Sequence, residues 1–126
     1  RNEMTYVGSW FGAVPPAPSG TTSAGQFGAP EAIAIAGGIA ARSLGSRNIL
    51  LIGEGGADDS LDRITGYASG DMVVISPYDG AVTITVVDAV GMNLQGVDFV
   101  MDDINDSMIL MNQGTDTWKE LSRSAN

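Results

Sequence analysis

Two short stretches of the chain gather carboxylates closely enough to suggest chemistry. DDSLD covers residues 58–62, and DDINDS covers residues 102–107. Carboxylate oxygens suit Ca²⁺, but neither stretch has the glycine and the closing glutamate of an EF-hand loop. Asp102 and Asp103 could also form the acid pair of a glycoside hydrolase, except that adjacent strand residues point to opposite faces. We therefore expect solvated turn acids, with no catalytic residue and no bound metal.

A glycine-rich stretch and a tryptophan offer two further possibilities. ILLIGEGGADD, residues 49–59, follows an apolar run as a dinucleotide-binding loop does, but its third glycine is misplaced and no amphipathic helix follows. A turn between strands is the better interpretation, and no cofactor is expected. Trp118 could stack on a sugar, yet an aromatic residue beside Leu121 on a strand more often belongs to the core.

Missing residue types exclude most other chemistry. The chain has no histidine and no cysteine, so disulfides, thiolate nucleophiles, Cys-based zinc sites and most hydrolase triads lack a required member. An enzyme is not expected. The net charge of −9, from 15 acidic and 6 basic residues, also argues against a nucleic-acid partner, because phosphate binding needs clustered Lys and Arg.

The sequence gives no sign of a membrane partner. The best apolar run, residues 29–41, is rich in small residues and shorter than the ~20 residues that a membrane-spanning helix needs. RNEMTYVGSW at the start does not have the pattern of a signal peptide. We expect a soluble chain.

The elements that must position these residues are strands. From Glu31 to Asn126, short β-branched or apolar runs alternate with Gly, Asp, Asn and Pro. Helical periodicity is absent except in residues 57–67, where it is too weak, and the segment too acidic, to cover a sheet. Asp79 and Gly80 give the clearest hairpin signal between two runs. The runs are AIAIAGGIAA, NILLIG, GDMVVIS, AVTITVVD, VDFVMD, SMILM and TWKELS. This pattern predicts an all-β domain.

Three of the runs are apolar on both faces: MVVI at 72–75, TVV at 85–87 and MILM at 108–111. A half-buried strand should alternate, so the second face needs cover that no helix supplies. Other copies of the chain are the simplest cover, which predicts a homotrimeric β-prism or β-helix-like domain; a small β-sandwich within one chain is the alternative. The expected trimer core is Met72, Val74, Val82, Ile84, Val86, Met108, Leu110 and Trp118.

Residues 1–30 have a different composition and are expected to form an extended N-terminal arm before a β-rich trimerisation domain at 31–126. Residues 11–30 are mostly Gly, Pro, Ser, Thr and Ala, and the PPAP segment favours an extended path. Sparse large apolar side chains suit docking into another surface, although Trp10 and Phe11 could instead pack on their own domain. The expected anchors are Met4, Tyr6, Trp10 and Phe11.

Residues 49–126 carry a series of short motifs. They lie in RITGYASGDMVVI, VTITVVDAVGMNLQGVDFVMDDINDSMILM and TWKELSRS, after the lead-in LIGEGGADDSLDRITG. The marked positions are Ile64, Gly66, Gly70, Asp71, Asp88, Gly91, Asn93, Leu94, Gly96, Asp98, Asp106, Trp118, Glu120, Leu121, Ser122, Arg123 and Ser124. Together these motifs resemble a β-structured module near the C-termini of tailed-bacteriophage virion proteins. Gly-x-Asn-Leu and the Trp-x-Glu-Leu-Ser-Arg ending are the more specific part.

The resemblance implies a trimeric β-prism or β-helix on a tail fibre, a tailspike or a head-decoration protein, and no activity by itself. The short chain favours a capsid decoration, or cement, protein that binds and stabilises the head shell of major capsid protein through its arms. The alternative is a tail-fibre or receptor-binding adhesin module that contacts host-surface glycan. Either protein would belong to the virion, assembled in the host cytoplasm.

Overall fold

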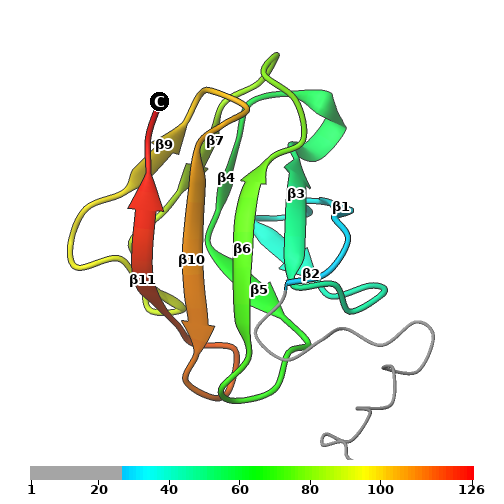
Figure 1. Cartoon of the computed structure of the whole chain (residues 1–126). Coiled ribbons are helices and arrows are strands. Elements are labelled where there is room, and N and C mark those ends of the chain that lie inside the picture. Colours follow the sequence, from blue (N-terminus) through cyan, green and yellow to red (C-terminus); the bar gives the residue numbers. More distant parts are fainter. Residues whose placement is uncertain (1–26) are drawn as a thin grey trace, which may run out of the picture.

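The computed structural model describes residues 27–126 (Figure 1). The predicted anchors Met4, Tyr6, Trp10 and Phe11 lie outside the described residues. The described residues form eleven strands and one 3-10 turn, η1 (Glu54–Gly56). The strands are β1 (Glu31–Ala34), β2 (Ile39–Ala41), β3 (Asn48–Ile52), β4 (Asp59–Leu61), β5 (Arg63–Thr65), β6 (Met72–Pro77), β7 (Ile84–Val86), β8 (Met92–Asn93), β9 (Phe99–Met101), β10 (Ser107–Asn112) and β11 (Trp118–Ser124). The domain is all-β, as predicted.

The first seven strands form a β-helix-like solenoid. Strand β1 pairs in parallel with β3, and β3 with β6, while β2 pairs with β5 and β4 with β7. Each strand therefore pairs with a strand of the next coil and not with its neighbour in sequence. Ile39 lies opposite Arg63 and Asp59 opposite Ile84, a repeat of roughly 25 residues, as in other solenoids.

Antiparallel strands complete the domain after the last coil. Strand β9 pairs with β7, β10 with β6, and β11 with β10, while β8 runs parallel to β11. The largest sheet has the order β1-β3-β6-β10-β11-β8. In Figure 1 it faces the reader, with β4, β7 and β9 behind it. Sheets of two and three strands complete the wall, so three sheets surround the core where the sandwich alternative required two.

The core lies within one chain. In β6 and β10 every second residue points inward and is buried, whereas the residues between them are half-buried. The buried residues form a single cluster that draws on all three sheets. Because the inward positions of β3, β6 and β10 carry Ile, Leu, Val and Met, their burial excludes water from the middle of the solenoid.

The hairpin prediction at Asp79 and Gly80 is wrong. Strand β6 belongs to the six-stranded sheet and β7 to the three-stranded sheet, so the chain turns a corner of the solenoid there. The tight hairpin lies between β10 and β11, at residues 113–117, where Gly114, Thr115 and Asp116 have positive φ. An Asp-Gly pair permits a sharp turn, but the choice of pairing partner depends on the core.

Candidate functional site: the outer apolar face

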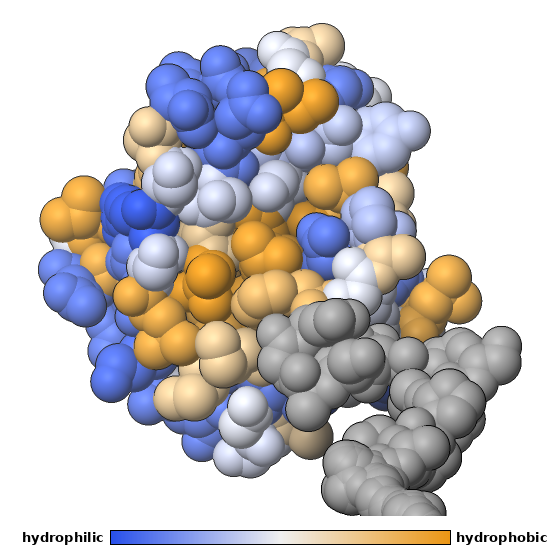
Figure 2. Space-filling model, in the orientation of Figure 1, coloured by the Kyte–Doolittle hydropathy of each residue, from blue (hydrophilic) through white to orange (hydrophobic). Residues whose placement is uncertain are grey.

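The six-stranded sheet carries apolar side chains on its outer side as well as on its inner side. In β3, β6 and β10 the inward residues are buried, whereas the alternate residues are half-buried. We call the outward group the outer apolar face: Ala32, Ala34, Leu50, Ile52, Met72, Val74, Ile109 and Met111. Figure 2 shows apolar residues gathered over β10 and β6 on this side of the domain. In the apolar runs of β6 and β10, one face is thus buried in the core and the other is left half-buried by the described residues.

The strand register places outer residues beside one another in pairs. Met72 lies opposite Met111 and Val74 opposite Ile109 across the β6–β10 pair. Leu50 lies beside Ala32 across the β1–β3 pair. Side chains that face each other across strands contact one another, so the outward residues of β6 and β10 form one apolar group and those of β1 and β3 another. Across the β3–β6 pair, Asn48 lies opposite Val74 and Ser76 opposite Leu50, so the two groups are diagonal neighbours.

The outer apolar face is free of acids, although the chain is strongly acidic. Within the described strands of this sheet, the only charged residue in an outward position beside the patch is Lys119, which lies opposite Met111. Serines and Asn48 occupy the neighbouring outward positions, where Ser76 lies opposite Leu50. The three-stranded sheet differs, because its outward row is Ser60, Thr85 and Val100.

The residues predicted as a trimer core divide between two locations. Ile84, Val86, Met108, Leu110 and Trp118 are buried within one chain, so their burial needs no second copy. Val82 is partly buried and packs against the same core. Only Met72 and Val74 lie on the outer apolar face. Contact of these two with another copy stays a prediction.

The sequence prediction omitted six members of that face: Ala32, Ala34, Leu50, Ile52, Ile109 and Met111. In MILM, either Met108 and Leu110 or Ile109 and Met111 could point inward, because all four are large and apolar. The run itself does not distinguish its two faces. Only the pairing with β6, which places Met108 opposite buried Ile75, fixes the choice.

The two acidic stretches serve to hold turns. The Asp106 carboxylate, 1% exposed, accepts hydrogen bonds from the backbone N–H groups of Asp102 (3.0 Å), Asp103 (3.1 Å) and Asn126 (2.6 Å). Asp58 accepts the N–H of Thr83 (2.8 Å), which joins the turn before β4 to the turn before β7. Among the described residues, no group of three or more possible ligands could hold a metal ion.

Most other acids have the same role. Of the 14 acids in residues 27–126, 11 accept a hydrogen bond from a backbone N–H. At the corners of the solenoid, between strands, backbone N–H groups have no partner in a neighbouring strand. A carboxylate oxygen is a strong hydrogen-bond acceptor for such groups. The acidity of the chain thus follows largely from its many corners.

The glycine-rich stretch is one of these corners and has no helix after it. Gly53 packs so tightly that an added Cβ would lie 1.8 Å from the backbone oxygen of Ala57. The chain then makes the single turn η1, in which Gly55 has a φ of 67°. This geometry contains no helix N-terminus that could receive a pyrophosphate.

Trp118 lies inside the domain and is unavailable for stacking on a sugar. Its indole N–H donates to the Ile64 carbonyl at 2.9 Å, and Tyr67 meets its ring edge-on at 5.8 Å. The Tyr67 hydroxyl donates to the Ser46 carbonyl at 2.6 Å. Burial, together with the nearby Glu31 carboxylate, raises the pKa of Tyr67 to about 12.

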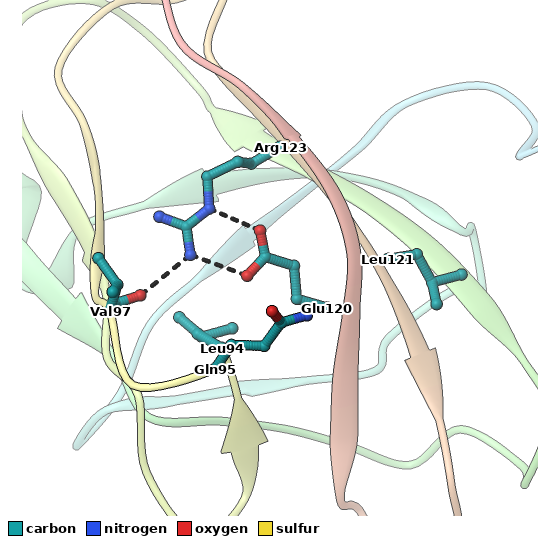
Figure 3. A pocket seen from close by; sticks show the side chains of 6 residues that line it. All are labelled: Leu94, Gln95, Val97, Glu120, Leu121 and Arg123. Carbon is teal, nitrogen blue, oxygen red and sulfur yellow. Dashed lines mark hydrogen bonds and ion pairs between the residues drawn. The ribbon is translucent and has the colours of Figure 1, made fainter.

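A shallow pocket of about 360 Å³ lies beside β11 (Figure 3). Arg123 dominates it, but its guanidinium is already engaged: it pairs with Glu120 at 2.5 and 2.8 Å and donates to the Val97 and Asp98 carbonyls. The hydrogen bond with Glu120 raises the pKa of Arg123. Arg123 also lies over the Phe99 ring. The residues that line the pocket therefore connect β11 to the segment before β9.

Comparisons with protein-family models, with curated proteins and with solved structures gave no match. Within residues 27–126, no helix is long and apolar enough to cross a membrane. Among the described residues, the outer apolar face is the largest apolar grouping outside the core.

Proposed function

We propose that this chain is a structural protein of a tailed-phage virion, a capsid decoration protein. Residues 31–126 form the hub of a homotrimer, and residues 1–30 of each copy bind the shell of major capsid protein. The protein acts by binding alone and carries out no chemical step.

The proposal rests on one observation: the side chains of the phage-like motifs hold the fold together. Trp118 and Asp106 are buried and hydrogen-bonded, and Arg123 joins β11 to the chain before β9. Asp88 and Asp98 accept backbone N–H groups in the same region. The residues of the phage-like motifs therefore support a rigid scaffold, which is what a decoration protein requires.

Multivalency explains how such a scaffold would hold a shell. Once one arm of a trimer has docked, the second and third docking events become intramolecular, so weak individual contacts add up to tight attachment. Met4, Tyr6, Trp10 and Phe11 are the proposed anchors. Large apolar and aromatic residues of this kind commonly dominate the energetics of docking.

The test is co-sedimentation with expanded, empty capsids. Replacing Met4, Tyr6, Trp10 and Phe11 together by Ala should abolish binding, because each lost contact is lost at all three arms. Replacing Thr5 and Ser9 by Ala, in the same segment, should leave binding unchanged. Circular dichroism should show the same β fold in both variants.

Two outcomes would contradict this proposal. Undiminished capsid binding by the four-anchor variant would show that the arm does not attach the protein. Binding of the protein to host cells or host-surface glycan would favour the adhesin alternative, in which the β domain itself contacts the host.

A further inference from the structure

We infer that the outer apolar face is the surface through which copies of this chain associate, face against face. This inference rests on the proposed function in one respect: it names the surface through which the proposed homotrimer would assemble. It commits to one kind of occupant, other copies of the same chain, and requires no capsid.

Charge favours a second copy over a basic partner. The chain carries a net charge of −9, yet the outward positions of β1, β3, β6 and β10 contain no acid. A surface that bound a basic protein would gain from acids, which this chain has in excess elsewhere. A surface that meets an equally acidic copy must exclude them, since like charges brought into contact cost several kcal/mol.

The edges of the sheet are less suited to association than its face. Pro30 precedes the edge strand β1, and Glu31 at its start points inward, where it accepts the N–H groups of Leu44 (2.7 Å) and Ser46 (3.1 Å). Proline and inward-pointing charges are devices that discourage pairing at an edge. The opposite edge strand, β8, has two residues. Packing of sheet faces is therefore the route that remains.

The size of the face predicts weak association. Four strands about 4.8 Å apart, each contributing about five residues at about 3.3 Å, give roughly 300 Å² in projection. A stable interface buries about 800 Å² on each partner. Contact through this face alone should therefore depend on protein concentration, which makes it measurable by sedimentation.

The experiment compares substitutions that keep the β-branched shape required in a strand. Replacing Val74 and Ile109 together by Thr removes apolar surface from the centre of the outer apolar face. We expect self-association of the full chain, measured by sedimentation velocity over a range of concentrations, to weaken roughly tenfold or more. Val100→Thr is the matched control, because Val100 is 51% exposed on a different sheet. It should associate like the parent protein.

Thermal unfolding checks that the variants fold; if the double variant does not, Met111→Gln replaces it. Equal association of the face and control variants would overturn the inference. So would a parent protein that is monomeric at all concentrations, because the face would then have another occupant. Failure of the parent protein to bind capsids, with its self-association intact, would refute the proposed function and leave this inference standing.

Discussion

At the scale of single residues, most acids within residues 27–126, together with Trp118 and Tyr67, form hydrogen bonds with backbone groups. Asp106, Glu31 and Trp118 are buried polar or charged side chains, and each has hydrogen-bond partners in the backbone. A buried polar group without partners would cost roughly 1–3 kcal/mol, so these pairings explain why such residues are tolerated inside a small domain. Residue types that suggested chemistry in the sequence are thus accounted for by local structure.

Because of Tyr67, the free energy of unfolding of the domain should depend on pH in the alkaline range. The folded pKa is about 12, whereas an unperturbed tyrosine has 10.0, so between these values the unfolded chain ionises first. The stability that Tyr67 contributes is complete below pH 10 and is lost as pH rises toward 12, at up to about 1.4 kcal/mol per pH unit. Urea unfolding of the parent and of Tyr67→Phe should differ most below pH 10. A difference independent of pH would contradict this assignment.

At the scale of elements, the sequence located strands better than it located their partners. GDMVVIS, SMILM and TWKELS coincide with β6, β10 and β11 because apolar and β-branched residues favour a pleated, half-buried surface. The parallel pairing of β1 with β3 and of β2 with β5 left no such local signal. Neighbouring strands occupy different sheets, and each coil needs only one or two inward apolar residues per strand, too few to make a visible repeat.

The turn between β9 and β10 allows the role of its acids to be tested. Asp106→Asn keeps the shape but replaces one acceptor oxygen by a donor, so one or more of its three N–H partners loses its acceptor. We expect the free energy of unfolding to fall by roughly 1–3 kcal/mol, measured by urea denaturation.

Asp102→Asn in the same turn is the control, since it makes the same change of charge at an exposed position. It should cost far less. Equal losses in the two variants would indicate an effect of charge. A rise in melting temperature on adding Ca²⁺ to the parent would restore the cation-site interpretation of this stretch.

At the scale of the whole molecule, residues 27–126 enclose a core and also carry an apolar face that they do not cover themselves. The sequence correctly predicted that strands such as MILM have two apolar faces, but it could not divide the residues between them. Five of the eight residues predicted for the trimer core, Met108 and Trp118 among them, are enclosed by one chain. The division depends on which strand each run pairs with, and that is a property of the assembled solenoid.

The last prediction concerns the stoichiometry and salt dependence of the assembly. Three copies around an axis would turn each outer apolar face inward, so the mass from light scattering should rise with concentration from 13.0 kDa toward three times that value. Each copy carries −9 charges, so repulsion opposes assembly, and added salt should strengthen association by screening it. Association through surface ion pairs would show the opposite dependence. A plateau at twice the chain mass would contradict the trimer and leave the face-to-face contact intact. If added salt weakened the association, the outer apolar face would not be its cause.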